Sequence, residues 1–327
     1  MTLEFNGTCN AIQAVSASEV WIGCGKGKVW HTSDGGQQWQ TFTLSPDGGE
    51  ISDIDVAGTT VWASNTLSEV HRGSGCVGTD LSSCTWSRIE FDGSDLYPQG
   101  SAPLLRAIAA VSDTTAWVAG DFGEWTNYGC WAQILKTTDG GASWQKQDSS
   151  IGTWAGGDCN QKGIVGIDAI DENNAVALSA GGLYEKTIDG GLSWNFAKGY
   201  GPGERFGSVK MIDAMNVWVQ YGRFIYRTTT GGEGDSAWGG VGLQGMQTNS
   251  IYDLDAVGME TAVVVGEYGK IFRTTNGSAT HEANWIEVTS PLPNSSSSTI
   301  FAVSILDGDD TGWAIGQSGD AMKVLRK

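Results

Sequence analysis

Two segments of the chain combine carboxylates with large aromatic side chains at short spacing. They span residues 121–131 and 151–159, and their candidate residues are Asp121, Glu124, Trp125, Tyr128, Trp131, Trp154 and Asp158. Aromatic faces beside carboxylates suit the binding of a sugar ring or of a partner's apolar anchor. Two carboxylates could instead act as acid and base, or as acid and nucleophile, in glycoside hydrolysis. Asp121 and Glu124 are only three positions apart on one loop, which argues against opposed placement across a sugar.

Both segments interrupt a repeat that runs through the chain. Residues 32–39, 137–144 and 187–194 read Thr-x-Asp-Gly-Gly-x-x-Trp, where x varies. In this phrase the Asp side chain can accept hydrogen bonds from its own backbone, and the two glycines accept positive φ. Each phrase follows an apolar run, which in turn follows another turn. The phrase therefore predicts a hairpin turn inside a unit of four short strands.

Weaker copies of this unit fill the rest of the chain. They begin near Cys9, Ile51, Leu104, Ile164, Phe206, Ile251 and Ile300. This spacing is close to the roughly 40–50 residues of a four-stranded propeller blade. The sequence thus predicts an all-β protein with one domain over residues 1–327, a single seven-bladed β-propeller of four-stranded blades. The last unit holds three predicted strands, so we expect residues 2–5 to supply its fourth strand and close the ring.

The repeat accounts for most of the 15 tryptophans. Five occupy one position of the second strand, and six close the repeated turn. Trp30 lies in an apolar column of the third strand, which leaves Trp125, Trp131 and Trp154 unexplained. We expect their loops, in blades 3 and 4, to project from the face opposite the repeated turns. Tyr97, Arg205 and Tyr268 lie on other loops of that face and complete the candidate ligand-binding set. A local core in which Trp125 packs on Trp154 is the alternative.

Six cysteines pair readily in the blade arrangement. We predict the disulfides Cys9–Cys24, Cys76–Cys84 and Cys130–Cys159, which indicate an oxidising compartment. No Cys-x-x-Cys or His/Cys cluster indicates zinc, and Asp307–Asp310 occupies an ordinary turn position. We therefore expect no metal and no cofactor.

The charge balance is strongly acidic. There are 37 acidic and 19 basic residues, a formal net charge of −18, which argues against nucleic acid as a partner. A basic column precedes the repeated turn in five blades, and we expect it to pair with carboxylates of neighbouring blades or else to form a docking surface. Its members are His31, Lys136, Lys186, Arg227 and Arg273. No apolar run has the length of a transmembrane segment, and the chain shows no signal peptide.

The repeated phrase resembles the Asp-box, or BNR, repeat. With the apolar run and glycines that precede it, the pattern resembles the photosystem II stability/assembly factor-like propellers, and it is similar to blades of xyloglucanases and sialidases. The resemblance implies that the repeated turn is structural and lies away from the functional face. The structural residues would be Asp34, Trp39, Asp139, Trp144, Asp189 and Trp194.

The chain departs from each of these relatives. It lacks the Phe/Tyr-Arg-Ile-Pro segment of sialidases and has one propeller where xyloglucanases have two. Its inner strands are expected to be acidic, with Asp55, Asp168, Asp213 and Asp255 against Lys210 and Arg106, whereas the photosystem assembly factor binds through a basic patch.

Three functions follow as hypotheses. The favoured one is a non-catalytic, extracytoplasmic propeller that binds a protein or glycan through the top-face loops of blades 3 and 4. A carbohydrate-active enzyme on the same face, with Asp121 and Glu124 as its acids, is the alternative. A repeating subunit of a surface layer or appendage is the third.

Overall fold

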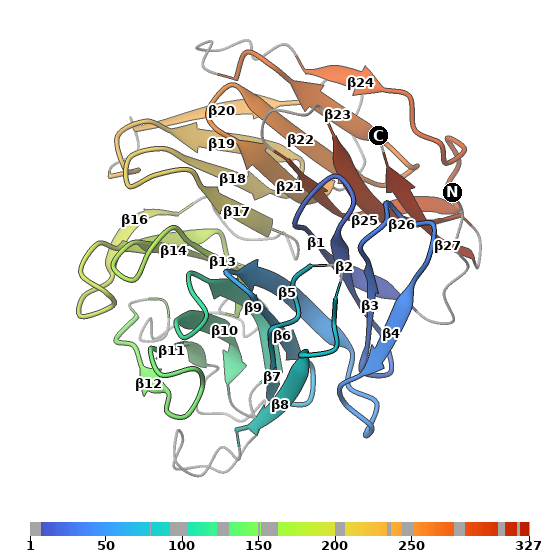
Figure 1. Cartoon of the computed structure of the whole chain (residues 1–327). Coiled ribbons are helices and arrows are strands. Elements are labelled where there is room, and N and C mark those ends of the chain that lie inside the picture. The colour runs from blue at the N-terminus through green and yellow to red at the C-terminus, as the bar shows by residue number, and fades with distance from the viewer. Residues whose placement is uncertain are drawn as a thin grey trace.

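The computed structural model describes residues 8–78, 80–91, 104–122, 131–149, 151, 163–199, 207–233, 237–243, 251–277, 285–306, 311–318 and 321–326. Its strands form antiparallel sheets arranged around a central axis (Figure 1), each sheet following the order of the chain. Among the described residues no helix is long and apolar enough to cross a membrane.

Six of the sheets are blades of four strands. Blade 1 contains β1 (Cys9–Ala14), β2 (Val20–Cys24), β3 (Lys28–Thr32) and β4 (Gln40–Thr43). Blade 2 contains β5 (Ile51–Ala57), β6 (Thr60–Asn65), β7 (Glu69–Ser74) and β8 (Thr85–Glu90). Blade 3 contains β9 (Leu104–Ala110), β10 (Ala116–Phe122), β11 (Trp131–Thr137) and β12 (Gln145–Lys146).

The chain continues around the axis in the same way. Blade 4 contains β13 (Ile164–Ala169), β14 (Ala175–Ser179), β15 (Leu183–Thr187) and β16 (Asn195–Gly199). Blade 5 contains β17 (Gly207–Met211), β18 (Val217–Tyr221), β19 (Phe224–Thr228) and β20 (Trp238–Gly242). Blade 6 contains β21 (Ile251–Val257), β22 (Thr261–Gly266), β23 (Ile271–Thr274) and β24 (Ile286–Val288). The remaining sheet has three strands, β25 (Ser298–Ile305), β26 (Gly312–Ser318) and β27 (Ala321–Arg326).

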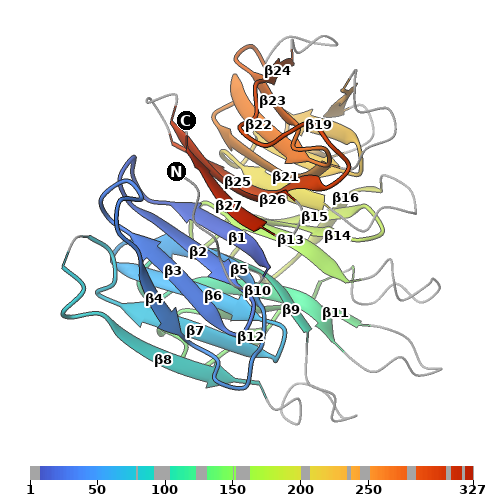
Figure 2. The same ribbon diagram turned by 90° about the vertical axis from the view of Figure 1, so that its right-hand side faces the viewer.

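The prediction of seven four-stranded blades is wrong. The structure has six blades of four strands, and the sheet β25–β26–β27 has three among the described residues. Among the described residues β27 is the outermost strand of this sheet, and residues 2–5, the predicted fourth strand, lie outside the described part of the chain. The innermost strands still contact one another in sequence, and β25 contacts β1. Figure 2 shows the three-stranded sheet beside blade 1.

Tryptophan pairs fill the spaces between neighbouring sheets. The Trp that closes one blade's outer turn packs edge-on against the second-strand Trp of the preceding sheet. Ring centroids are 6.3 Å apart for Trp62 and Trp144 and 5.8 Å apart for Trp117 and Trp194. Blade 4 has no second-strand Trp, and Tyr184 of its third strand packs against Trp238 at 4.9 Å. These contacts, together with the buried aliphatic side chains, form the core between blades.

Residues 32–39, 137–144 and 187–194, called here the repeat turns, share one hydrogen-bond pattern. In the second of them the Thr137 hydroxyl donates to Asp139 at 2.8 Å and accepts from the Gly141 N–H at 2.9 Å. Asp139 also accepts from the N–H and the hydroxyl of Ser143. Gly140 and Gly141 have φ of 74° and 87°, which explains why glycine occupies both positions.

Two lysines of the basic column, Lys136 and Lys186, join neighbouring blades through backbone carbonyls. Lys136 donates to the carbonyl oxygens of Glu172 and Gly190 in blade 4, at 2.6 and 3.0 Å. Lys186 likewise donates to the carbonyl oxygen of Ala214 in blade 5. For these two lysines the expected pairing with carboxylates is wrong. Their acceptors are backbone carbonyls, which every residue type provides.

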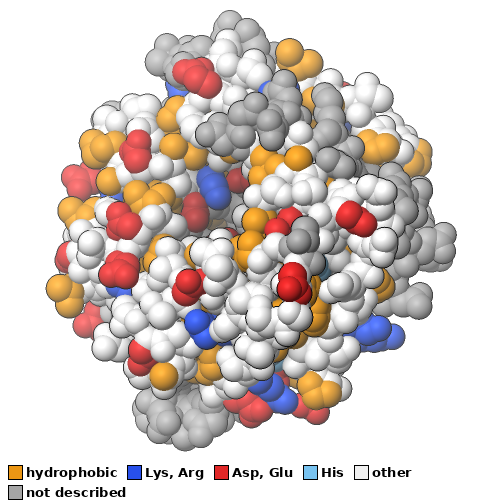
Figure 3. Space-filling view, in the orientation of Figure 1, with side chains coloured by type: hydrophobic (Ala, Val, Ile, Leu, Met, Phe, Trp, Pro, Cys, Tyr) orange, Lys and Arg blue, Asp and Glu red, His pale blue; other side chains and the backbone are white. Residues whose placement is uncertain are grey.

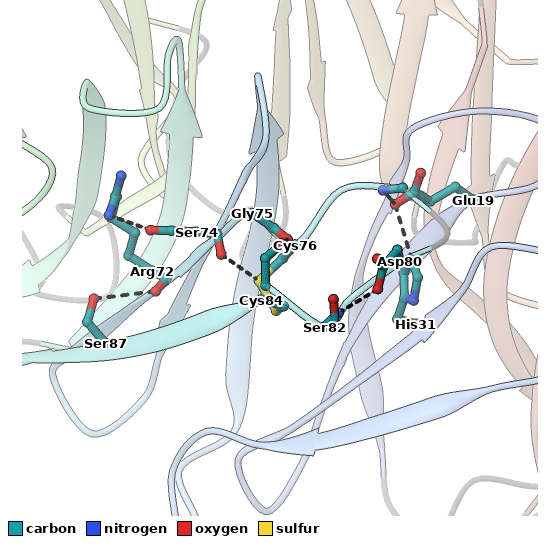
Figure 4. The surroundings of a disulfide bond; sticks show 12 residues. Glu19, His31, Arg72, Ser74, Gly75, Cys76, Asp80, Ser82, Cys84 and Ser87 are labelled. Carbon is teal, nitrogen blue, oxygen red and sulfur yellow. Dashed lines mark hydrogen bonds and ion pairs between the residues drawn. A yellow bond between two sulfur atoms is a disulfide. The ribbon is translucent and has the colours of Figure 1, made fainter.

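Two of the predicted disulfides are present. They join Cys9 to Cys24 and Cys76 to Cys84. Glu19 of blade 1 anchors the second disulfide's loop, because its carboxylate accepts the Gly78 N–H at 2.8 Å and also contacts His31 at 3.1 Å (Figure 4). Cys130 and Cys159 lie outside the described residues, so their pairing stays a prediction.

Candidate functional site

The innermost strands surround a cavity of about 230 Å³ on the propeller axis. Every sheet contributes to its lining. The lining segments are 10–13, 52–55, 106–108, 165–168, 207–210, 252–255 and 301–304. These segments lie in the first part of the innermost strands, where the chain enters each sheet from the preceding one. The cavity therefore begins on the face of the propeller that carries the connections between sheets.

A β-bulge recurs near the start of the innermost strands. The register between first and second strand shifts at the same position in every sheet except blade 5. The residues at this shift, called here the rim residues, are Asn10, Ser52, Arg106, Val165, Tyr252 and Phe301. A bulge turns a side chain away from the regular alternation of a strand and is frequent beside binding sites. Here the shift brings cationic, amide and aromatic side chains to one ring of the cavity lining.

Two contacts organise the rim. Arg106 binds Asp121 of β10, with its Nη2 2.6 Å and its Nε 2.7 Å from the same carboxylate oxygen. Tyr252 and Phe301 meet edge to face with centroids 5.9 Å apart. The other carboxylate oxygen of Asp121 is buried without a hydrogen-bond partner among the described residues. The Asp121 carboxylate is therefore committed to an ion pair at the rim.

Deeper in the cavity, aspartates on the innermost strands of blades 2, 4 and 6 bind the innermost strand of the next sheet. Asp53 accepts the Ile108 N–H at 2.9 Å, and Asp55 accepts the Ala110 N–H at 2.7 Å. The same bond recurs from Asp168, Asp253 and Asp255 to the following sheet. Ser304 makes the equivalent bond from the three-stranded sheet to blade 1, where its hydroxyl accepts the Ala14 N–H at 3.1 Å. Asp213, which we expected on an inner strand, lies instead in the β17–β18 turn and accepts the N–H groups of Met215 and Asn216.

Four of the inner carboxyl groups have raised pKa values. Burial raises the pKa of Asp53 to about 8 and that of Asp253 to about 7, against the opposing effect of two backbone N–H bonds each. Burial also raises the pKa of Asp55 to about 6. It shifts the pKa of Asp168 in the same direction.

Lys210 is the cation within this carboxylate group. Its Nζ lies 3.6 Å from Asp255, and its side chain remains 36% exposed to the cavity. The charges of Asp168, Asp255 and Asp55 raise the pKa of Lys210. The amine therefore stays protonated and offsets part of the carboxylate charge on the axis.

The structure describes only some of the predicted site residues. Asp121 lies near the end of β10, and the backbone of Trp131 starts β11. Tyr268 has a positive φ of 60° in the β22–β23 turn and is 36% exposed. The antiparallel strand order places the β10–β11 and β22–β23 turns on the cavity's starting face. Outside the described residues lie Tyr97, Glu124, Trp125, Tyr128, Trp154, Asp158 and Arg205.

Sequence reasoning missed the rim residues and the Arg106–Asp121 pair. A bulge depends on how two strands pair, which the residues of one strand do not reveal. The inner aspartates did have a signal in the sequence. Asp-x-Asp occurs at 53–55 and again at 253–255, which are equivalent positions of blades 2 and 6.

Comparison with solved structures places the chain among β-propellers. YCF48 bound to D1 peptide matches with a TM-score of 0.67 and 18% identity, over 100% of this chain and 94% of that one. YCF48 from Cyanidioschyzon merolae matches with a TM-score of 0.67 and 16% identity, over 99% and 97%. The computationally designed Ika8 protein matches with a TM-score of 0.59 and 13% identity, over 99% and 98%. No protein-family model and no curated protein matches the chain. At these identities the likeness shows the fold alone.

Proposed function

We propose that this propeller is a non-catalytic binding protein that recognises a segment of a partner protein at the rim of its axial cavity. The observation that carries the proposal is the ring of bulged residues, which brings Arg106, Tyr252 and Phe301 to one ring of the cavity lining. Aromatic and Arg side chains are the usual anchors of protein interfaces. One of the similar propellers is a YCF48 structure with a bound D1 peptide, which supports peptide binding as a use of this fold.

We propose further that the connections of blades 3 and 4 extend this site. Trp125 and Tyr128 lie between β10 and β11 in the sequence, Trp154 lies between β12 and β13, and Trp131 is the first residue of β11. The repeat requires none of them. A glycan is the second candidate ligand, because the same aromatic and carboxylate side chains suit sugar rings.

An ion pair weakens the enzymatic alternative. Asp121 is the described member of the proposed acid pair, and its carboxylate is bound to Arg106. Both contacts from Arg106 go to one carboxylate oxygen, so only the other oxygen is open to acid–base chemistry. Binding uses the ion pair as it stands, because the pair fixes Arg106 and Asp121 as a preformed polar contact.

Three further proposals concern the cellular location, the class of repeat and the number of domains. We infer an extracytoplasmic location from the disulfides Cys9–Cys24 and Cys76–Cys84. We interpret the repeat turns as Asp-boxes on the strength of their Thr, Asp, Gly and Trp positions. We also propose that residues 1–327 form one domain.

A peptide array and a glycan array probed with the full chain test the proposal. Ligands found there are then titrated against Tyr252→Ala, Arg106→Gln and Trp125→Ala. We expect peptide ligands and at least about a tenfold loss of affinity in these variants. Phe224→Ala is the control, because Phe224 is an exposed aromatic side chain on the third strand of blade 5, outside the cavity lining. Equal affinity in all variants, or turnover of a glycan on the array, would overturn the proposal.

A further inference from the structure

The repeat turn of blade 4 exposes apolar side chains where its copies have small or polar ones. Ile188 is 61% exposed and Leu192 is 86% exposed. Aligned on the Thr and Asp of the turn, Ile188 corresponds to Ser33 and Thr138. Leu192 corresponds to Gln37, Ala142 and, in blade 5, Glu233. The other copies of the turn therefore show which residue types the turn accepts at these two positions.

The turn's hydrogen bonds do not involve either side chain. Thr187 donates to Asp189 at 2.8 Å, and Asp189 accepts from the N–H and the hydroxyl of Ser193. The equivalent bonds hold residues 137–143 together with Thr and Ala at the two positions. Folding therefore gives no reason for Ile188 and Leu192, and leaving them in water costs free energy.

Neighbouring turns add two more exposed apolar side chains. The Gly190 N–H donates to the Asn173 carbonyl, which joins the repeat turn to the β13–β14 turn that begins with Ile170. Lys186 reaches the Ala214 carbonyl in the β17–β18 turn, next to Met215. Ile170 is 39% exposed and Met215 is 50% exposed. The blade 4 surface is defined here as Ile170, Ile188, Leu192 and Met215.

Met215 is also apolar where the equivalent residues of other blades are polar. In five blades the first glycine of the third-to-fourth-strand turn donates its N–H to the carbonyl of a residue in a first-to-second-strand turn. That residue is Ser18 in blade 1, Thr114 in blade 3, Asn173 in blade 4, Glu260 in blade 6 and Met215 in blade 5. Apolar substitutions in two successive blades therefore coincide on adjoining turns.

Acidic side chains accompany this apolar surface. Asp171 and Glu172 belong to the β13–β14 turn, Asp189 to the repeat turn and Asp213 to the β17–β18 turn. The lysines of the same region, Lys136 and Lys186, are held at backbone carbonyls. Figure 3 shows hydrophobic and acidic side chains interspersed over blades 4 and 5 at the left of the view.

We propose that the blade 4 surface is a second docking site, which binds a basic amphipathic segment of a partner protein. Apolar side chains of that segment cover Ile188, Leu192 and Met215, and its Lys or Arg side chains meet Asp171, Glu172 and Asp213. A second copy of this chain fits poorly, because each copy carries a net charge of −18. The surface consists of first-to-second and third-to-fourth strand turns, so it lies opposite the face on which the cavity begins.

Designed peptides test this proposal independently of the cavity ligand. The probes are an amphipathic Leu/Lys helix, a Leu/Glu helix of the same pattern and a Ser/Lys peptide of the same charge, each read by fluorescence anisotropy. The full chain is expected to bind the Leu/Lys peptide alone, more weakly as salt rises. The double variant Ile188→Thr, Leu192→Gln takes its residues from blades 3 and 1, so it should fold, and it is expected to lose at least about tenfold in affinity.

The controls separate this site from others. Ile286→Thr removes an equally exposed side chain, at 67%, from the outermost strand of blade 6 and should leave affinity unchanged. Tyr252→Ala, which tests the cavity, should also leave it unchanged. Equal binding by the double variant, binding of the Ser/Lys peptide as tight as that of Leu/Lys, or binding to zwitterionic vesicles would overturn the proposal. So would self-association that the double variant abolishes, since a second copy would then be the occupant.

Discussion

The repeat turns and the innermost strands both use aspartate to accept backbone N–H groups, yet the two regions hold these carboxyl groups in opposite ways. In the repeat turns Asp139 and Asp189 lie at the surface, and hydrogen bonds from Ser and Thr lower their pKa values to about 2. On the inner strands Asp53 and Asp253 are half-buried around the axial cavity, and their pKa values rise to about 8 and 7. Solvation, rather than the number of hydrogen bonds, therefore decides the sign of the shift.

The two regions give opposite dependences of stability on pH. A carboxyl group with a lowered pKa stabilises the fold above its unfolded pKa, and this contribution is lost as pH falls through the folded value. A carboxyl group with a raised pKa stabilises the fold below its unfolded pKa, and this contribution is lost as pH rises through the folded value. The carboxyl groups of the repeat turns therefore stabilise the fold at neutral pH. Those of the inner strands stabilise it most at mildly acidic pH.

Replacement of Lys210 should have the largest effect on the inner strands. Lys210→Met removes the cation that faces Asp55, Asp168 and Asp255. We expect a loss of about 2–3 kcal/mol in the free energy of unfolding at about pH 8, below the figure for a fully buried pair because the lysine is partly exposed. The loss should shrink near pH 5, where Asp55, with a pKa of about 6, is protonated.

Urea unfolding at the two pH values measures this difference. Lys28→Met on the third strand β3 is the control and should change stability little. An equal loss at both pH values would show that Lys210 acts through packing and not through charge.

Asp253→Asn should flatten the pH dependence of stability. The carboxylate accepts N–H groups from Leu254 and Val303, and its pKa is about 7. Wild-type stability should fall as pH rises from about 5 to about 8.5, and the variant should lose roughly 1–2 kcal/mol less over that range. Asn keeps one acceptor oxygen, so the variant starts from lower stability at the acidic end. Parallel curves for the two proteins would refute the raised pKa.

Ser304→Ala tests the same inter-sheet bond without a titrating group. Ser304 is buried, and its hydroxyl accepts the Ala14 N–H between the three-stranded sheet and blade 1. We expect a loss of about 1 kcal/mol that is the same at every pH between about 5 and 8.5. Thermal or urea unfolding of the variant beside Asp253→Asn gives the comparison, and a pH-dependent loss would show that neighbouring carboxyl groups compensate.

The sequence predicted the repeat turns and two disulfides because each depends on residues close together in the chain or on repeated positions. The strand count of the last sheet and the rim residues depend on pairing between strands. The sequence shows that residues 53 and 253 are aspartates. It does not show that their pKa values are raised while that of Asp139 is lowered, because this difference follows from burial around the axis. Tyr184 was missed for a similar reason, since it replaces a Trp of a different strand in the packing between blades 4 and 5.

Asp139→Asn is expected to give the smallest effect, and its sign completes the comparison. The side chain is exposed, so at neutral pH the variant should lower the melting temperature by only a few degrees through the lost bonds to Ser143. As pH falls from about 4 toward about 2, wild-type Asp139 becomes protonated and the difference between the two proteins should disappear. Melting curves across that range provide the measurement, with Asp148→Asn, an exposed aspartate outside the repeat turns, as the control. A difference that persists at the acidic end would mean that the turn depends on the shape of the Asp side chain and not on its charge.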